Sequence, residues 1–141
     1  MEAYTQRVAH RMPEPDTGSV DGDLTAFLAQ LYRVVDHPPR VRALRGLMAE
    51  AQLDPAFADP FRDWVDSRRQ VVVRLLERAA HRGEIVPDAD LGYVADLVFG
   101  PFWYRLLVQH APLDPADAPG HATRLLEGLR PRSGPPARGQ M

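Results

Sequence analysis

Three observations in the sequence predict an all-α fold, a helical bundle of five to six helices with short connections. Apolar residues recur every three or four positions in each long segment, as on one face of a helix. No segment alternates apolar and polar residues with the period of two that a half-buried strand requires. Prolines, glycines and aspartates separate the segments, and these residues are typical of helix starts and stops.

The composition predicts one soluble domain and excludes several classes of function. The chain has 141 residues, of which 45% are hydrophobic and 26% charged, and its formal net charge is -2. We therefore expect no general electrostatic attraction to DNA or to an anionic membrane. The sequence contains no cysteine, which excludes disulfides, thiolate catalysis and cysteine-ligated zinc. No apolar run approaches the roughly 20 residues of a membrane span and no signal-peptide core is found, so we expect a cytoplasmic protein.

The choice of residues also bears on the origin of the chain. All 17 basic residues are arginine, and neither lysine nor asparagine occurs in the sequence. Because the codons for lysine and asparagine are AT-rich, we infer a GC-rich bacterial genome.

The N-terminal residues are predicted to form a short helix over about 2–11, which two prolines then end. The stretch PDTGSVDGDL at 15–24 carries glycines and aspartates that could belong to a phosphate-binding or a calcium-binding loop. A phosphate-binding loop would need a preceding strand and a lysine, and a calcium loop would need a glutamate at its end. Neither pattern is met. The sequence therefore predicts a connector in which Ser19 or Asp21 caps a helix that runs to about Val35.

Prolines mark the helix starts in the middle of the chain. Pro38-Pro39 begins the second helix of the domain, because proline is tolerated at the first helical position. Asp54-Pro55 gives another capped start, and after Pro60 the longest helix is expected over about 61–82. Gly83 then supplies a left-handed stop.

Two helices are predicted in the C-terminal part. Asp88 or Asp90 caps the first, which is expected to run to about Gln109 with an interruption at Gly100-Pro101 in the form of a kink. The regular part of the last helix is expected over about 121–129. Residues 131–141 contain prolines and glycines with almost no large apolar side chain, and we expect a disordered tail there.

The predicted helix over about 90–109 is apolar on every side. Its apolar residues fall on three faces: Leu91, Val94, Ala95, Val98 and Phe102; Tyr93, Leu97, Tyr104 and Val108; and Phe99, Trp103 and Leu106. A helix that is apolar all round must be covered all round. A partner subunit explains this more simply than a wholly internal helix, which is the alternative. This apolar helix and the last helix of each subunit would then form a four-helix bundle across a twofold axis.

Arg68 is the second unusual position, because it lies near the centre of the apolar stripe of the longest helix. That stripe consists of Phe61, Trp64, Val65, Val72, Leu75 and Ala79. Arginine is rarely buried unless it is paired, since removing its charge from water is costly. Arg68 therefore either lines a cavity and meets a polar or acidic group of a ligand, or forms a structural pair with an aspartate, or extends to the surface.

The sequence carries no pattern of a catalytic or metal site. The five histidines are scattered, and none has a second histidine at the helical spacing that a metal site uses. None of the three serines, Ser19, Ser67 and Ser133, sits in a strand-turn-helix elbow. We expect no enzyme, no metal and no cofactor; the only catalytic candidate would be Arg68 with an acidic neighbour. The arginine clusters are interspersed with acids and do not predict nucleic-acid binding within this chain.

The order of these segments resembles the C-terminal domain of TetR/AcrR-type transcriptional regulators. The likeness is distributed over about residues 2–130 and is not a single motif. It is carried by PDTGS at 15–19, GDL at 22–24, LMAEA at 47–51, DPAF at 54–57, RR at 68–69, LLERA at 75–79, RGE at 82–84, PDAD at 87–90, GPFWYRLL at 100–107 and LDP at 113–115.

The resemblance implies a homodimer and a pocket for a small effector that is hydrophobic or amphipathic. It places the dimer interface within residues 90–130, where the candidates are Leu97, Phe99, Trp103, Tyr104, Val108, Leu125, Leu126 and Leu129. It places the pocket among the other helices, where the candidate ligand-binding residues are Phe27, Leu31, Leu44, Met48, Phe61, Trp64, Arg68 and Trp103.

The resemblance also implies regulation of transcription by effector-dependent DNA binding. The N-terminal helix-turn-helix of such regulators is not found in this sequence, so we expect DNA binding only in a longer form. Residues 1–12 are then the remnant of a linker helix, and residues 13–130 form the effector-binding and dimerisation domain. The alternative is a helical protein-interaction module without a ligand pocket.

Overall fold

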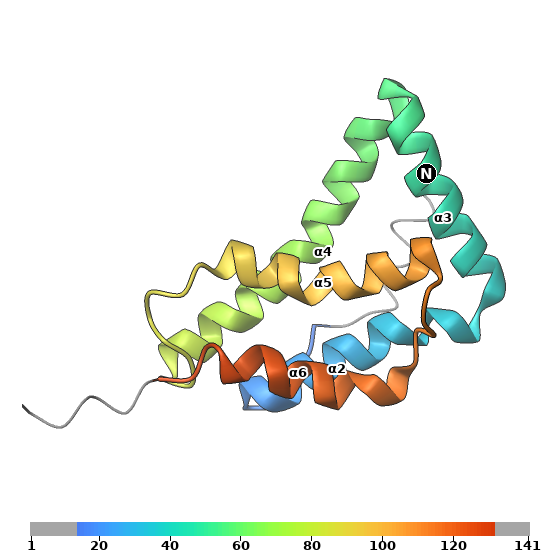
Figure 1. The fold of residues 1–141 in the computed structure, drawn as a ribbon. Helices are drawn as coiled ribbons and strands as arrows, with labels where there is room; N and C mark the ends of the chain where they lie inside the picture. The colour runs from blue at the N-terminus through green and yellow to red at the C-terminus, as the bar shows by residue number, and fades with distance from the viewer. Residues whose placement is uncertain (1–13, 132–141) are drawn as a thin grey trace, which may run out of the picture.

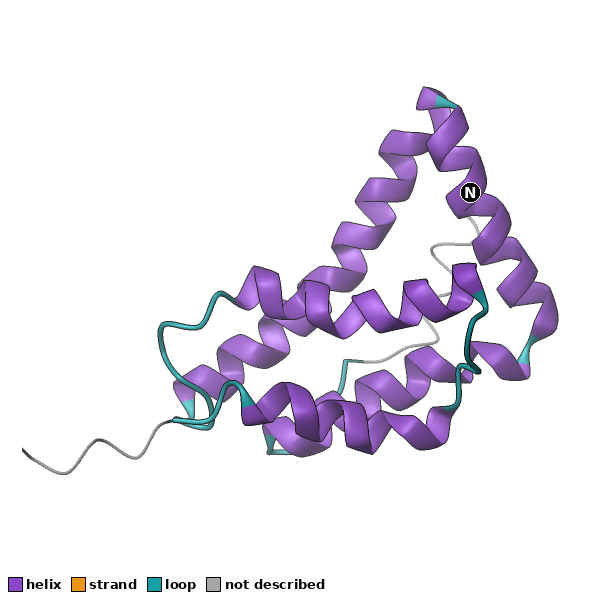
Figure 2. Cartoon of the chain, in the orientation of Figure 1, coloured by secondary structure: helices purple, strands orange, loops and turns teal. Residues whose placement is uncertain are grey.

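The computed structural model describes residues 14–131, and every regular element in that range is helical (Figures 1 and 2). The predicted helix over 2–11 and most of the predicted tail lie outside the described residues. The all-α prediction is confirmed. In chain order the elements are α2 (Val20–Tyr32), the 3-10 helix η1 (Arg33–Asp36), α3 (Pro38–Leu53), α4 (Pro55–His81), α5 (Leu91–Val108), the 3-10 helix η2 (Pro115–Asp117) and α6 (Ala118–Glu127).

Short polar side chains start the helices where the sequence predicts it. The Ser19 hydroxyl accepts a hydrogen bond from the Gly22 N–H at 3.1 Å, so the stretch at 15–24 is a capped connector into α2. Asp54 caps α4 and Asp90 caps α5 in the same way, at 2.9 and 3.1 Å. Gly83, with φ 77°, follows the end of α4 in the left-handed region that an L side chain rarely adopts.

Two prolines interrupt the helices less than the sequence suggests. The expected separation before Phe61 is wrong, because α4 is one helix from Pro55 to His81 with Pro60 inside it. Pro60 removes one backbone hydrogen bond near the start of a helix of 27 residues, and the burial of Phe61 directly after it favours the helical conformation there. The last helix begins at Ala118 and not near His121, because Pro119 occupies the first turn, where N–H groups have no partner within the helix.

α5 has no break at Gly100-Pro101, since the helix runs from Leu91 to Val108 with Pro101 inside it, and the kink expected there stays a prediction. Pro101 has no N–H, so the carbonyl of Leu97 lacks the donor that it would have in a regular helix. Packing of the neighbouring Phe102 against the core keeps this segment helical despite the missing bond.

The helices form a bundle around one core, with a projecting hairpin. α2 and α6 lie side by side, and α5 runs across the bundle next to the C-terminal part of α4 (Figure 1). α3 and the first half of α4 project together from one end. The core is formed mainly by α2, α4, α5 and α6, with its largest enclosed side chains being Phe27, Phe102, Leu24, Leu28, Leu75, Leu76, Ile85, Leu106, Leu126, Val20, Val72 and Val98.

A buried carboxylate ties the start of α2 to the end of α4. Asp23 is 0% exposed, and its Oδ1 accepts hydrogen bonds from the backbone N–H of Thr17 at 2.6 Å and from the Thr17 hydroxyl at 2.8 Å. Its Oδ2 lies 3.6 Å from Nη2 of Arg78 and 3.8 Å from Nη2 of Arg82. Because a buried charge is costly unless it is paired, this cluster holds the two helix ends in one arrangement.

Glu84 closes the same end of the bundle from the loop after α4. Its Oε2 accepts a hydrogen bond from the backbone N–H of Val20 at 2.9 Å, and its Oε1 pairs with Arg82. The Val20 N–H, followed by Arg82, lowers the pKa of the Glu84 carboxyl from its ordinary value. The N-terminus of α2 is therefore satisfied by its own cap and by a carboxylate from a distant part of the chain.

Replacing Asp23 with alanine is expected to lower the free energy of unfolding by about 3 kcal/mol, because it leaves the Thr17 N–H without its acceptor and removes the buried carboxylate that lies beside two partly buried arginines. Asp21→Ala is the matched control. Asp21 pairs with Arg130 at 3.1 Å where both side chains are more than half exposed, so its loss should cost less than about 1 kcal/mol. Urea denaturation measures both; equal losses would contradict the role of Asp23.

Candidate functional site

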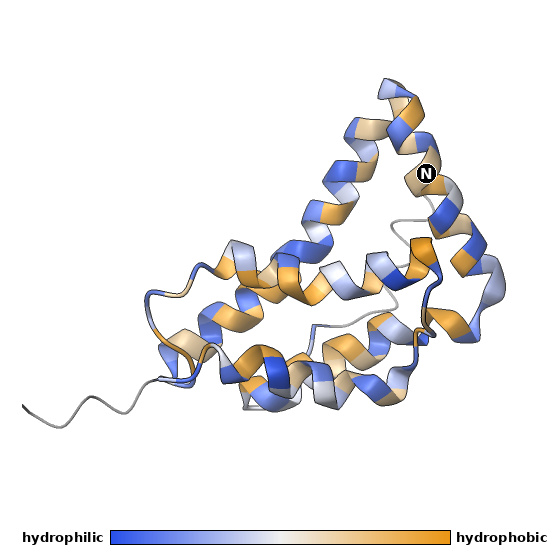
Figure 3. Cartoon of the chain, in the orientation of Figure 1, coloured by the Kyte–Doolittle hydropathy of each residue, from blue (hydrophilic) through white to orange (hydrophobic). Residues whose placement is uncertain are grey.

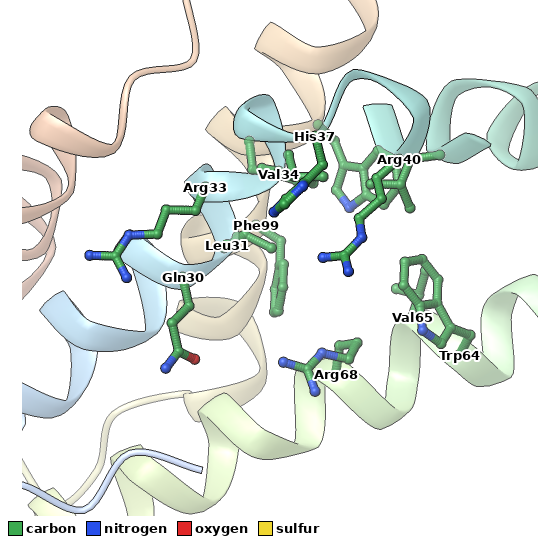
Figure 4. A pocket seen from close by; sticks show the side chains of 13 residues that line it. Gln30, Leu31, Arg33, Val34, His37, Arg40, Trp64, Val65, Arg68 and Phe99 are labelled. Atoms are coloured by element: carbon green, nitrogen blue, oxygen red, sulfur yellow. The ribbon is translucent and has the colours of Figure 1, made fainter. Parts of the chain in front are cut away.

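A cavity of about 290 Å³ lies among α2, α3, α4 and α5, beside the core (Figure 4). The end of α2 and the following η1 form one wall, and the start of α3 forms a second. The projecting part of α4 and the middle of α5 supply the others. The lining residues are Gln30, Leu31, Arg33, Val34, His37, Arg40, Leu44, Trp64, Val65, Arg68, Phe99, Phe102 and Trp103.

The lining divides into an apolar part and a cationic part. The apolar part includes Leu31, Leu44 and the aromatic rings of α4 and α5. The polar groups are Gln30, Arg33, His37, Arg40 and Arg68, and no aspartate or glutamate lines the cavity among the described residues. A ligand that matches both parts would have an apolar body and a polar or negatively charged group.

Packed aromatic rings make the wall between the cavity and the core. Phe99 meets Phe27 edge to face at 5.6 Å between ring centroids, and Trp103 meets Phe102 at 5.3 Å and Phe61 at 5.9 Å. Such edge contacts fix the ring orientations and add to the stabilisation from burial. This wall is therefore a preformed surface of the folded chain.

Arg68 projects from α4 into the cavity and is only 9% exposed. Its guanidinium carbon lies 5.7 Å from the centroid of the Phe27 ring, a distance at which the ring face attracts a cation. Burial lowers the pKa of the Arg68 guanidinium from its ordinary value. An arginine remains protonated at neutral pH in a protein, so the cavity contains a charge that is largely shielded from water.

The structure brings five of the eight predicted ligand-binding residues to the cavity: Leu31, Leu44, Trp64, Arg68 and Trp103. Phe27 and Phe61 are buried behind the aromatic wall, in contact with rings that line the cavity. Met48 lies further along α3 and does not line the cavity; its sulfur accepts a hydrogen bond from Gln52. A binding role for each of these residues remains a prediction.

Sequence reasoning missed the polar part of the lining. Gln30, Arg33 and His37 follow one another at intervals of three and four residues, next to the apolar positions Leu31 and Val34. This polar strip at the edge of an apolar stripe is a signal that the sequence contains. Val34 on η1 was missed as well, and so were Arg40, Val65, Phe99 and Phe102, whose place depends on how α3, α4 and α5 pack.

The outer face of α5 exposes large apolar side chains to solvent, and Figure 3 shows hydrophobic residues recurring along this helix. Tyr104 is 58% exposed, and its large apolar neighbours with exposed side chains on α5 are Tyr93, Leu97, Leu107 and Val108. Exposed apolar patches of this kind mark interaction surfaces on soluble domains. No helix within residues 14–131 has both the length and the hydropathy that a bilayer crossing requires.

The residues predicted for a dimer interface fall in three environments. Leu97, Tyr104 and Val108 lie on the exposed face of α5, and Leu125 and Leu129 are half-buried near the end of α6. Phe99 and Trp103 line the cavity. Leu126 is 1% exposed and belongs to the core of its own subunit, so it has no surface to offer a partner.

The side chain of His121, on α6, lies against α5 next to the point where Pro101 removes a backbone hydrogen bond. Its imidazole lies against the backbone carbonyls of Leu97 and Val98, the first of which lacks its donor because of Pro101. Burial lowers the pKa of His121 from its ordinary value, and the two carbonyls offset part of that shift. His121 therefore prefers to be neutral in the folded chain.

The free energy of unfolding should fall as the pH is lowered from about 6.5 to 5, because the unfolded chain then binds a proton at His121 that the folded chain resists. This contribution is fully present above the ordinary histidine pKa and is lost as the pH falls through the lower value of the folded state. His121→Gln should remove much of the slope in urea denaturation. His81→Gln, at an exposed site, should leave it; an unchanged slope in His121→Gln would contradict this account.

Comparison with known proteins gives one family and several relatives. Residues 14–125 match the family model described as tetracyclin repressor-like, C-terminal domain. The chain is 30% identical over 109 residues to the HTH-type transcriptional regulator YdeS of Bacillus subtilis (strain 168), which covers 77% of this chain and 54% of YdeS. It is 25% identical over 113 residues to the HTH-type transcriptional regulator Rv1556 of Mycobacterium tuberculosis (strain H37Rv), covering 79% of this chain and 55% of that protein.

A solved structure supports the same relationship. The crystal structure of the TetR family transcription regulator SCO0332 matches with a TM-score of 0.81 and 33% sequence identity, over 91% of this chain and 71% of that chain. At this identity the similarity extends beyond the fold. The chain spans about half the length of the two transcriptional regulators described above.

Proposed function

Because the chain belongs to the tetracyclin repressor-like C-terminal domain family, we propose that it is the effector-sensing and dimerisation part of a transcriptional regulator. The matched relatives are HTH-type transcriptional regulators, and in this proposal DNA binding belongs to a part of the regulator outside the matched region. The proposed role is binding and not catalysis, in a cytoplasmic protein. Operator binding and the regulated genes belong to the longer form.

The observation that carries the sensing role is the 290 Å³ cavity with one buried arginine among aromatic walls. Its volume is close to the lower end of the range for small-molecule sites, which begins at about 300 Å³. Apolar lining with a few convergent polar groups is the usual composition of such sites. The proposed ligand residues are those of the predicted set that line the cavity, with Arg68 as the group that selects a polar ligand.

The exposed face of α5 supports the dimerisation role. Its apolar side chains would be covered if the same face of a second subunit packed on it about a twofold axis. α6 contacts α5, and the half-buried Leu125 and Leu129, in and just after α6, would extend the contact. Two helices from each subunit would then form a four-helix bundle.

Population shift is the mechanism that this arrangement supports. Phe99 and Trp103 line the cavity, while Leu97 and Tyr104 lie on the outer face of the same helix. A ligand that contacts the inner side chains therefore acts on the helix that would hold the two subunits together. It biases the dimer toward one arrangement by no more than its difference in affinity between the two arrangements.

A thermal-shift screen of hydrophobic and amphipathic compounds should find stabilising ligands. At a concentration of about 100 times Kd, a ligand adds about 2.7 kcal/mol to the free energy of unfolding. For a domain of this size that corresponds to a rise in Tm of roughly 8 °C. Val65→Phe, which fills part of the cavity, should reduce the shift. If no compound in a broad screen stabilised the chain, a protein-interaction module would be the better reading.

Leu97→Glu should weaken dimerisation, because it places an unpaired charge in a desolvated contact. Leu53→Glu is the matched control at the tip of the projecting hairpin, where Leu53 is 81% exposed. Sedimentation velocity over a concentration series should give a dimer for the wild type and for Leu53→Glu, and a weaker dimer for Leu97→Glu. A wild-type chain that is monomeric at all concentrations would contradict the proposed interface.

A further inference from the structure

Aromatic side chains reach the cavity from two walls. Trp64 comes from α4 and Trp103 from α5, and they are the two tryptophans of the sequence. Both contact the ring of Phe61, at 5.8 and 5.9 Å between ring centroids and with ring planes inclined by 50° and 69°. Phe61 therefore joins the aromatic surfaces of the two walls.

The rings that line the cavity are less buried than the rings behind them. Trp64, Phe99 and Trp103 are half-buried, whereas Phe27 is 2% and Phe61 5% exposed. In Figure 4 the rings of Phe99 and Trp64 lie on opposite sides of the space that the lining encloses. Part of the aromatic surface of two helices is thus uncovered where the cavity borders it.

The lining rings of α5 contact their neighbours edge to face. Phe99 and Phe27 have ring planes at 88°, and Trp103 and Phe102 have ring planes at 78°. A contact of this kind occupies one edge or one face of a ring. The remaining faces and edges of Phe99 and Trp103 can therefore make further aromatic contacts.

We propose that the effector contains a flat aromatic ring system that binds between Trp64 on α4 and the rings of Phe99 and Trp103 on α5, an inference that rests on the proposed sensing function. An aromatic ring has a negative face and a positive edge, so it makes edge-to-face and offset contacts that a saturated ring lacks. Each such contact strengthens binding roughly two- to tenfold beyond the effect of the area that it buries.

The volume limits the size of this ring system. A water molecule occupies about 30 Å³ in the liquid, so a cavity of 290 Å³ holds about ten non-hydrogen atoms. Two fused rings with one oxygen substituent have about this size, as in indan-1-one and 2-naphthol. Octahydroinden-1-one and decahydro-2-naphthol carry the same oxygen on saturated rings, so each aromatic compound has a matched saturated control.

This comparison separates aromatic contacts from hydrophobic burial. The saturated member of each pair has more hydrogen atoms and at least as much apolar surface, so burial of area alone favours it. Calorimetric titration gives Kd for each compound, and the indole N–H resonances of Trp64 and Trp103 in NMR spectra show whether it binds in the cavity. At least one aromatic compound should bind about fivefold or more tightly than its saturated control.

Trp64→Leu and Trp103→Leu should each lower this ratio of the two Kd values by about threefold, because each removes one aromatic contact. Trp64→Phe keeps a ring at the same position and should retain most of the ratio. Tyr104→Leu is the matched control, since Tyr104 is an exposed aromatic residue next to Trp103 that does not line the cavity. It should leave the ratio unchanged. The Tm of each variant is measured in parallel, because both tryptophans pack against Phe61.

The outcomes separate this inference from the function on which it rests. Saturated compounds that bind as tightly as their aromatic partners, or folded leucine variants that keep the wild-type ratio, would overturn the aromatic inference and leave the sensing role intact. If none of the four compounds binds, the aromatic inference fails; the sensing role then fails as well only if the broad thermal-shift screen also gives no ligand.

Discussion

α5 has to satisfy three environments at once, and the arrangement of the other helices follows from this constraint. Its Val98 and Phe102 enter the core with α2, α4 and α6, its Phe99 and Trp103 face the cavity, and its Tyr104 meets solvent. No single layer of neighbouring helices could cover all three sides in a domain of this size. The core, the cavity and the outer face therefore all follow from the need to cover the apolar surface of α5.

The two ends of the bundle are built differently, and this difference suits a sensor. At one end Asp23 and Glu84 hold the start of α2 to the end of α4 through buried and partly buried ion pairs. At the other end the cavity separates the projecting part of α4 from α2, and apolar and aromatic side chains form much of its lining. A ligand therefore acts where the helices are held mainly by apolar contacts, while the opposite end keeps its register.

Much of the fold could be predicted from local signals, and much of the cavity could not. Ser19, Asp54 and Asp90 are caps whose effect depends only on the following few residues, so the helix starts were predictable. Pro60 and Pro119 were misjudged, because the cost of a proline depends on which turn of the helix it occupies. The apolar excess of α5 was visible from its pattern, and so was the odd position of Arg68. That Arg40 lines the same cavity as Arg68 depends on the packing of α3 against α4, which no local pattern specifies.

Pro101 gives α5 a point of low bending stiffness. In most of the helix a tilt of one half against the other must stretch backbone hydrogen bonds, but the bond from residue 101 to the Leu97 carbonyl is already missing. The side chains of Phe99 and Trp103, which lie on either side of this point, also line the cavity. A molecule slightly larger than the cavity would then bend α5 at Pro101 at a small cost in free energy. The part of α5 after Pro101 would change its direction relative to the part before it.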